Sequence, residues 1–397
     1  MIAKQMVKEV AGSSAIRSMF LEGKKMSEEI GAENVYDFSL GNPMTPVPKE
    51  VNQAIIDAVK NQNSMELHGY MDNAGYPATR QAVAENLNRR FAVNFKWQNI
   101  IMTVGAAGAL NVVLKTILDP QEEVLVFAPY FGEYRGYVRN HQGILKEVKP
   151  QIPSFQPDFI DLKQKITPHT KAVIINNPVN PTGIVYGIDT ITQITSILKE
   201  KQQEYQHEIY LISDEPYREL VYEGQEVPFL TNYYENTFIT YSFSKSLSIP
   251  GERIGYIAVP NQMADCEQVV GALSVANRML GYVNAPSLMQ KAIEKSIDAP
   301  TDVAYYDRNR TLIYENLIKM GFECVKPQGA FYLFIKSPVD QEEVFVNSAK
   351  KYHILLVKGS AFACPGYVRL AYCVSYETIE RSLNAFRQLA LEWGLKG

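Results

Sequence analysis

From about residue 50 onward, short apolar runs alternate with stretches whose apolar residues recur at helical spacing. The candidate strands are residues 99–103, 123–127, 172–175, 209–212, 238–241 and 254–259. Residues 106–118 and 191–203 lie between them and carry apolar side chains three and four positions apart. This alternation predicts an α/β domain with a mostly parallel sheet flanked by helices.

The pattern changes after about residue 290. Charged helical stretches run to Met320 with a break at Pro300, and a closing helix is expected over residues 378–393. Short apolar runs at 331–335 and 367–371 indicate strands between them, which together predict a smaller α+β domain. The segment before Pro48 shows no sheet partner of its own and is expected to pack beside that domain. The expected division is 48–290 for the large domain and 1–47 together with 291–397 for the small one.

Composition argues against several classes of partner. Of the 397 residues 46% are hydrophobic, and the net charge of -4 gives no reason to expect nucleic acid or an anionic membrane. No window reaches the roughly 18 apolar residues of a membrane span, and residues 1–19 lack a signal-peptide core, so a cytoplasmic location is expected. The four cysteines are widely spaced and no histidine stands at metal spacing, so we expect neither disulfides nor a metal site.

Ligands of open parallel sheets bind outside the carboxyl ends of the strands, so the residues that follow each apolar run are informative. The run 99–103 is followed by Gly105, Ala106, Ala107 and Gly108 at the start of a helix. Small residues there expose backbone N–H groups to an anion such as phosphate. A strand-to-helix turn that needs small residues only for packing is the alternative.

Polar side chains follow the next strands as well. Asn176 to Gly183 contains two prolines that fix the backbone and leave amide side chains projecting from a rigid turn. Asp214 follows the run 209–212, and Tyr217 lies three residues beyond it. A carboxylate in that position can also serve as a helix N-cap.

Lys245 follows the run 238–241, just after Ser242 and Ser244. A lysine at the end of a buried strand is costly unless it is paired or used covalently, although an isolated lysine could be a solvated loop residue. Because the polar groups after all these strands are expected at one edge of one sheet, we interpret them as a single site.

The motifs occur in the order known from one family. Residues 177–183 read Asn-Pro-Val-Asn-Pro-Thr-Gly, residues 214–217 read Asp-Glu-Pro-Tyr, and residues 242–245 read Ser-Phe-Ser-Lys, with Arg253 eight positions further on. From Gly41 to Arg369 the chain resembles the class I/II aminotransferases of the fold-type I family, which depend on pyridoxal 5'-phosphate (PLP). The resemblance implies a large domain with a seven-stranded type of sheet, a smaller α+β domain, and a homodimer with shared active sites.

The resemblance also implies roles for individual residues. Lys245 matches the lysine that holds PLP as a Schiff base and then carries a proton during the reaction. Asp214 matches the partner of the pyridine nitrogen, where a carboxylate favours a protonated, electron-accepting ring. Asn180 and Tyr217 match the donors to the phenolic oxygen.

For the phosphate, the resemblance implies the backbone of Gly105, Ala106 and Ala107 together with Ser242, Ser244 and Arg253. Tyr70 resembles the tyrosine that reaches the phosphate of the neighbouring subunit, with a packed surface aromatic as its alternative. Phe131 matches the aromatic residue that stacks on the cofactor ring.

Substrate contacts follow in the same way. Arg369 resembles the arginine that binds the substrate α-carboxylate through paired hydrogen bonds, and Gly41 the glycine that closes over it, with Asn180 beside them. This implies an α-amino acid and a 2-oxo acid as substrates, and closure of the smaller domain over them.

Three positions depart from the family pattern or fit it loosely. Thr79 stands before Arg80 where a leucine is usual, and Ala107 stands where one aspartate-using branch has a lysine. Arg278 lies near the place of an arginine for a distal carboxylate, with a surface ion pair as the alternative. Aspartate with 2-oxoglutarate is the first candidate pair, and aromatic donors or alanine follow.

Other functions remain open at this stage. A lyase or decarboxylase on the same fold would share Lys245, Asp214 and Arg253. A PLP-bearing transcription regulator would need a DNA-reading domain before Gly41, where only about 40 residues stand. A nicotinamide dehydrogenase would need the glycine fingerprint GxGxxG, which the first strand-to-helix turn lacks.

Overall fold

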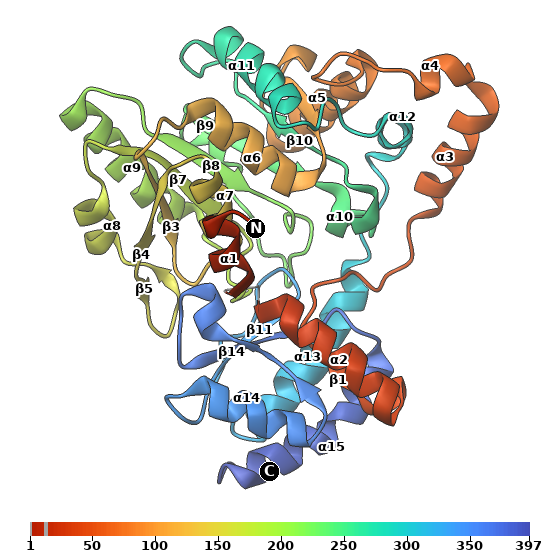
Figure 1. Cartoon of the computed structure of the whole chain (residues 1–397), viewed down its shortest axis with the longest axis vertical. Coiled ribbons are helices and arrows are strands. Elements are labelled where there is room, and N and C mark those ends of the chain that lie inside the picture. Colours follow the sequence, from red (N-terminus) through yellow and green to blue (C-terminus); the bar gives the residue numbers. More distant parts are fainter. Residues whose placement is uncertain (1, 12–14) are drawn as a thin grey trace.

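A seven-stranded sheet forms the centre of the molecule, and the computed structural model describes residues 2–11 and 15–397. Its strands run across the sheet in the order β2-β10-β9-β8-β7-β3-β4. Figure 1 shows this sheet in the upper part of the molecule, with helices around it. The strands are β2 (Ile100–Thr103), β3 (Glu123–Phe127), β4 (Ile144–Val148), β7 (Thr170–Asn176), β8 (Tyr210–Asp214), β9 (Thr237–Ser242) and β10 (Gly255–Ala258).

All pairs from β9 through β4 are parallel, and β10 is antiparallel to its neighbours β9 and β2. The expectation of a mostly parallel sheet is therefore confirmed. Asn176 is in register with Asp214, and Asp214 is in register with Thr240. The polar residues at the carboxyl ends of these strands consequently meet at one edge.

The sheet is buried on both faces. Along β3, Val124 and Val126 belong to one apolar cluster, whereas Leu125 and Phe127 belong to another, as the two-residue period of a strand requires. The first cluster also receives α6 (Gly105–Ile117) and α11 (Cys266–Met279), and the second receives α8 (Phe159–Lys165) and α9 (Ile188–Tyr205). Burial on both faces explains why the strands appear in the sequence as continuous apolar runs.

A third group of helices covers the β2–β10–β9 side. It contains α3 (Lys49–Asn61), α5 (Pro77–Phe91) and α12 (Ser287–Ser296), whose apolar residues join Ile100, Ile239 and Tyr256 in one cluster. Three shorter helices complete this part of the chain. They are α4 (Ser64–His68), α7 (Tyr134–Asn140) and α10 (Phe243–Ser246).

The lower part of Figure 1 contains the chain from α13 onward, roughly its last quarter. Its three-stranded antiparallel sheet has the order β11-β14-β13. Met19, Val35 and Phe38 share an apolar core with this part, and α2 lies beside it in Figure 1. The elements are α2 (Ala15–Ile30), α13 (Val303–Lys319), β11 (Tyr332–Lys336), α14 (Glu342–Lys351), β13 (Val357–Lys358), β14 (Tyr367–Ala371) and α15 (Tyr376–Glu392).

The amino-terminal segment corrects one expectation. It does have a sheet partner, because β1 (Tyr36–Asp37) pairs in parallel with β12 (Ile354–Leu355). Two residues are too short to show the alternation by which a strand is recognised. The helix α1 (Lys4–Ala11) precedes it, and residues 1 and 12–14, which the sequence assigned to the small domain, lie outside the described residues.

Strand β4 was not among the sequence-predicted strands. It carries Lys146 and Glu147 and lies at the edge of the sheet, where side chains are partly exposed, so it lacks a continuous apolar run. A two-stranded hairpin of β5 (Pro150–Gln151) and β6 (Gln156–Pro157) follows it. Edge strands and short hairpins are thus the elements that hydrophobic pattern alone does not reveal.

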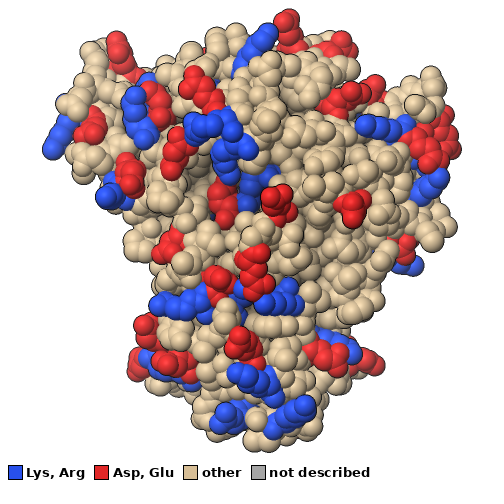
Figure 2. Space-filling view, turned by 180° about the vertical axis from the view of Figure 1, so that it is seen from behind, with Lys and Arg blue, Asp and Glu red and all other residues tan. Residues whose placement is uncertain are grey.

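The surface mixes charges of both signs. On the face in Figure 2, basic and acidic side chains are interspersed over the whole outline. No helix in the described part of the chain is long and apolar enough to cross a membrane. Cys364 and Cys373 are buried, whereas Cys266 and Cys324 are partly exposed.

Candidate active site

A cavity of about 260 Å³ opens at the carboxyl ends of the parallel strands. It brings together most of the residues singled out from the sequence. Those that line it are Gly41, Ala106, Ala107, Phe131, Asn180, Asp214, Tyr217, Ser242, Ser244, Lys245, Arg253 and Arg369. Gly105 borders it through Arg253, whereas Tyr70 and Arg278 do not line it.

Lys245 is positioned by α10, which begins directly after β9. Ser242 caps this helix, with its Oγ accepting a hydrogen bond from the backbone N–H of Ser244 at 3.2 Å. Lys245 Nζ donates to the carbonyl oxygen of Gly41 at 2.7 Å. Burial lowers the pKa of Lys245 to about 8, and the cationic Arg253 and Arg369 act in the same direction. The amine is therefore neutral far more often than an ordinary lysine at neutral pH.

Asp214 ends β8 and is buried. Tyr134 donates to its Oδ2 at 2.5 Å, and Asn176 Nδ2 donates to its backbone oxygen at 3.0 Å. Its Oδ1 is also buried and has no hydrogen-bond partner among the described residues. Burial raises the pKa of Asp214 to about 7, against the lowering effect of the Tyr134 hydrogen bond. An unpaired carboxylate oxygen of this kind is suited to a protonated ring nitrogen.

Arg369 lies on β14, the middle strand of the smaller sheet, and is a residue through which that sheet lines the cavity. Its side chain is 1% exposed, with Nη1 donating to Asn180 Oδ1 at 3.1 Å and Nη2 donating to the Ser39 carbonyl oxygen at 2.6 Å. The guanidinium carbon lies 4.5 Å from the centre of the Tyr332 ring. Arg369 Nε has no partner among the described residues, which leaves donors for a carboxylate.

The other wall holds Tyr217, whose hydroxyl lies 2.8 Å from the hydroxyl of Tyr332. Burial raises the pKa of Tyr217 well above its ordinary value, so its phenol keeps its proton. Either hydroxyl can donate to the other. If Tyr332 donates, the Tyr217 proton is free to point to a ligand.

An anion site lies at the start of α6. Gly105 has a φ of +78°, and a Cβ on it would fall 2.8 Å from Arg253 Nη2, so only glycine allows this approach. Arg253 is fixed by hydrogen bonds from Nη1 to the Pro250 carbonyl oxygen (3.0 Å) and from Nη2 to the Val104 carbonyl oxygen (3.4 Å). The hydroxyls of Ser242 and Ser244 lie 2.6 Å apart beside it. A guanidinium, two hydroxyls and a helix N-terminus together suit a phosphate group.

Several residues of the cavity were missed from the sequence. Tyr134 contacts Asp214, Tyr332 contacts Tyr217, and Tyr137 lines the cavity, yet none of them directly follows an apolar run. Asn176 stood at the end of a predicted strand and was given no role, although it donates to Asp214. Only for Asn176 did the sequence contain the signal, which was its position at a strand end.

Thr79, one of the departures from the family pattern, and its neighbour Arg80 both have a structural role. Thr79 is buried and donates to the Gln290 carbonyl oxygen at 3.2 Å, and Arg80 Nε donates to the Ile100 carbonyl oxygen at 2.7 Å. Both therefore hold α5 against its neighbours. Arg278 is exposed near the end of α11, and Tyr70 is 93% exposed.

The sheet order and this cavity define a fold-type I PLP-dependent enzyme, as the matches to known proteins also show. The chain belongs to the aminotransferases of class I and II, whose family model matches residues 33–386.

Individual relatives agree with this family. A crystal structure of an amino transferase from Eubacterium rectale is 44% identical, with a TM-score of 0.96 over 99% of both chains. A probable aspartate/prephenate aminotransferase of Thermus aquaticus is 32% identical over 97% of this chain and 98% of its own length. The aspartate aminotransferase of Thermus thermophilus, solved with maleate, has a TM-score of 0.86 at 27% identity over 96% of this chain and 98% of that one.

The protein is therefore an aminotransferase, its cofactor is PLP, and its substrates are an amino acid and a 2-oxo acid. The lyase or decarboxylase alternative is not favoured, because these relatives are aminotransferases. The residues present fit the cofactor. The unpaired Oδ1 of Asp214 can accept a hydrogen bond from a protonated pyridine nitrogen. The Arg253 guanidinium, which lies against Gly105 at the start of α6, can bind a phosphate.

Proposed function

We propose that the protein transfers the amino group of aspartate to 2-oxoglutarate, with Lys245 Nζ as the covalent anchor of PLP. The observation that carries this proposal is that Lys245, Asp214 and Arg369 line one cavity. The names of the Thermus relatives support aspartate as the amino donor.

Each part of the cofactor has a matching group in the cavity. Asp214 would hold the pyridine nitrogen, and Asn180 with Tyr217 would donate to the phenolic oxygen. Phe131 would stack on the ring. The phosphate would be held by the backbone of Gly105, Ala106 and Ala107 and by the side chains of Ser242, Ser244 and Arg253.

Bound PLP supplies the aldehyde that accepts the amino group and the ring that accepts electrons released at the substrate Cα. Asp214 contributes by keeping a proton on the ring nitrogen, because its buried carboxylate is stabilised by a cation beside it. Loss of this group should therefore affect the chemical step more than binding.

Arg369 would orient the substrate. Its Nε and the remaining guanidinium hydrogens can bind the α-carboxylate, while Asn180 and Ser39 fix the guanidinium plane. Gly41, whose carbonyl oxygen accepts from Lys245 Nζ, would cover the bound substrate.

Lys245 has a second role once its Nζ is free. A pKa of about 8 leaves a useful fraction of neutral amine at neutral pH, which can take the proton from the substrate Cα and return it.

An aromatic donor is the second candidate. Among the described residues that line the cavity, the cations are Lys245, Arg253 and Arg369, and each already has a role. An aromatic side chain would fit against the apolar walls, which include Phe131 and Tyr137. In addition, Ala107 stands at the position where one aspartate-using branch has a lysine. Arg278 could supply the missing cation only from another subunit.

We further propose a homodimer, in which Tyr70 of one subunit reaches the phosphate of the other. The domain division into 48–290 and 1–47 with 291–397 is proposed as well. It is supported by the core that Val35 and Phe38 share with residues of α13, β11, β14 and α15. A cytoplasmic location stays a prediction from the sequence.

The test is the absorption spectrum of the holoenzyme before and after addition of aspartate, alanine or phenylalanine, with Lys245→Ala as control. Conversion of the visible band to the shorter-wavelength amine form by aspartate, in the wild type only, supports the first candidate. Conversion by phenylalanine and not by aspartate supports the second. A purified protein that shows no band with added PLP contradicts the role of Lys245.

A further inference from the structure

A second cavity of about 460 Å³ adjoins α10, and it is larger than the active-site cavity. It lies between α5, the loop after β8, α10 and residues 297–302, which connect α12 to α13. We call these six residues the connector. The two cavities share no lining residue, although Lys245 lines one and Ser246 lines the other.

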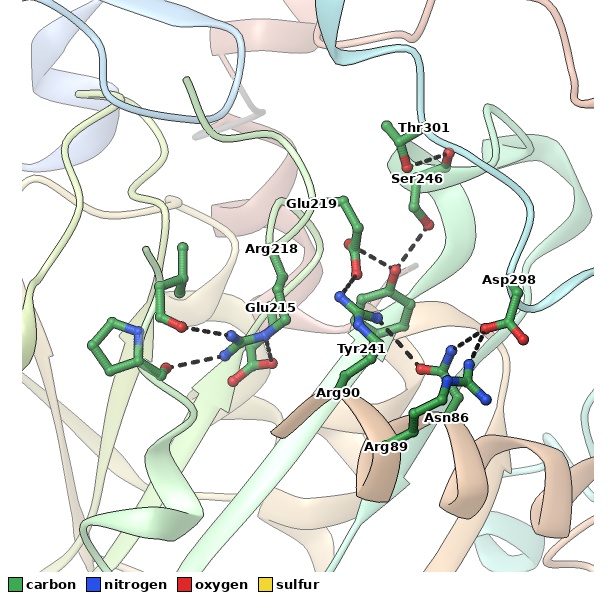
Figure 3. A network of polar contacts seen from close by, with 12 residues as sticks. Asn86, Arg89, Arg90, Glu215, Arg218, Glu219, Tyr241, Ser246, Asp298 and Thr301 are labelled. Carbon is green, nitrogen blue, oxygen red and sulfur yellow. Dashed lines mark hydrogen bonds and ion pairs between the residues drawn. The ribbon is translucent and has the colours of Figure 1, made fainter. Parts of the chain in front are cut away.

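A continuous chain of polar contacts crosses this second cavity (Figure 3). Asn86 Nδ2 donates to Asp298 Oδ1 at 2.7 Å, and Arg90 Nη1 donates to Asn86 Oδ1 at 3.4 Å. Arg90 Nη2 lies 2.8 Å from Glu219 Oε1. The Tyr241 hydroxyl donates to Glu219 Oε2 at 2.8 Å. A guanidinium and a carboxylate thus stand side by side in the wall.

The same chain connects the connector to α10. Ser246 Oγ lies 2.8 Å from the Tyr241 hydroxyl, and Thr301 Oγ1 donates to the Ser246 carbonyl oxygen at 3.0 Å. Asp298 and Thr301, both labelled in Figure 3, belong to the connector. An occupant of this cavity would therefore contact the residue that follows Lys245.

One phenol in the wall, that of Tyr256, forms no hydrogen bond with another described residue. The Tyr256 side chain is 4% exposed and stacks on Tyr241 with ring centres 5.0 Å apart. Its hydroxyl makes no hydrogen bond within the described part of the chain, although Arg90 and Glu219 act on it electrostatically. Because Tyr256 lines the cavity, this hydroxyl is available to a ligand there.

The charges in the wall favour a ligand with both signs. Arg90 retains N–H groups beyond its contacts with Asn86 and Glu219, and its side chain is 34% exposed. Glu219 is 17% exposed, with lone pairs left after its two hydrogen bonds. A simple anion would have to compete with Glu219 for Arg90, and a simple cation would have to compete with Arg90 for Glu219. A zwitterion would complement both residues.

We propose that this second cavity binds the zwitterion of a free α-amino acid with an apolar side chain. Its carboxylate would lie on Arg90 and the Tyr256 hydroxyl, and its ammonium group on Glu219. The side chain would pack on Val221, Leu247 and Ile297, which line the same cavity. The site is separate from the one where the reaction takes place.

The test uses L-leucine with the full-length holoenzyme, whose cofactor is first fixed on Lys245 by borohydride. Bound leucine is counted by equilibrium dialysis in the wild type and in Arg369→Leu, which removes the carboxylate contact of the active site. We expect one equivalent per chain that survives Arg369→Leu. In the Arg369→Leu background, Arg90→Gln should weaken it by roughly tenfold or more, and Tyr256→Phe by several-fold.

Two controls separate binding from folding. Ala299→Phe introduces a ring into the cavity wall and removes no polar group, so it should abolish this leucine binding while the melting temperature stays near that of the wild type. 4-Methylpentanoate lacks the ammonium group and 3-methylbutylamine lacks the carboxylate, so both should bind more weakly than leucine.

Several results would show that leucine does not bind in the second cavity. If Arg369→Leu abolishes leucine binding, the ligand lies in the active site and the proposal is wrong. If Ala299→Phe leaves the binding unchanged in the Arg369→Leu background, the ligand does not lie in the second cavity and the proposal is wrong as well. Equal binding of the two single-charge analogues also overturns it, as does the absence of any binding at millimolar leucine.

Discussion

Tyr134 donates a 2.5 Å hydrogen bond to Oδ2 of Asp214 and leaves Oδ1 of the same carboxylate unpaired. The phenol holds the carboxylate in one orientation and lowers its pKa against the effect of burial. Both effects favour a carboxylate that points an ionised oxygen to a cation. Tyr134 is therefore a positioning residue for Asp214.

Tyr134→Phe removes this hydrogen bond. The pKa of Asp214 should rise further, so the carboxylate holds a proton on the ring nitrogen less well. We expect kcat to fall by roughly tenfold, with KM for the amino acid little changed, because the bond acts on the chemical step. Steady-state kinetics measures both constants.

Tyr234→Phe is the matched control. It removes a buried hydrogen bond of similar kind, from the Tyr234 hydroxyl to the Ile209 carbonyl oxygen at 2.6 Å, outside the cavity lining. It should lower stability and leave kcat unchanged. A rise in KM with unchanged kcat for Tyr134→Phe would contradict a role through Asp214.

Asp214 should make the stability of the apoenzyme depend on pH. Its pKa is about 7 in the folded chain, against 3.8 for an ordinary aspartate. Between these values the folded chain keeps a proton that the unfolded chain has released, so the free energy of unfolding falls as pH rises. The loss amounts to roughly 4 kcal/mol at most above pH 7.

Asp214→Asn removes this titration. The apo variant should match the apo wild type near pH 4 and be more stable at pH 8, as urea unfolding of both proteins would show. A stability difference that stays constant from pH 4 to pH 8 would contradict the raised pKa. The variant should also lose most of its activity with PLP, since stability and function conflict at this carboxylate.

Tyr332 should tune the cofactor through Tyr217. If the Tyr332 hydroxyl donates to the Tyr217 hydroxyl, it strengthens the bond that Tyr217 donates to the phenolic oxygen. Tyr332→Phe keeps the ring over Arg369 and removes only this bond. We expect the pKa of the pH-dependent absorption change of the holoenzyme to rise by roughly a few tenths of a unit.

Tyr372→Phe provides the comparison. Tyr372 is also buried, and its hydroxyl contacts Tyr222 at 3.3 Å, but it does not line the cavity. The absorption titration of this variant should match that of the wild type. Equal shifts in both variants would indicate a general change in packing rather than an effect through Tyr217.

The sequence predicts those site residues whose chemistry and position in the chain coincide. Asp214 and Lys245 each follow a buried strand, and parallel strands place their carboxyl ends at one edge. Tyr134 and Tyr332 could not be identified, because they lie 80 and 115 residues from the partners they contact. Their roles depend on how a loop and a second sheet approach the cavity.

The same limit applies to the fold. The buried strands were predicted because both of their faces are apolar, whereas β4 at the sheet edge and the two-residue β1 were not. A strand that is short or half exposed has no pattern to distinguish it from a loop. Its pairing is decided by distant residues, such as Ile354 opposite Tyr36.

Tyr70 should act across the dimer. Its side chain is 93% exposed in the segment between α4 and α5 and does not line the cavity of its own chain. If it reaches the phosphate of the partner subunit, Tyr70→Phe should weaken PLP binding by roughly tenfold, since a hydrogen bond to a charged group is lost. Tyr76→Phe, which removes another, partly exposed phenol hydroxyl nearby, should not affect PLP binding.

Mixed dimers of Lys245→Ala and Tyr70→Phe chains decide whose site Tyr70 serves. In such a hybrid, the site that retains Lys245 receives an intact Tyr70 from the Lys245→Ala subunit. One site per hybrid should then bind PLP with wild-type affinity, whereas Tyr70→Phe homodimers bind it weakly. If the hybrid binds PLP as weakly as those homodimers, Tyr70 acts within its own subunit. Sedimentation as a monomer would contradict the dimer itself.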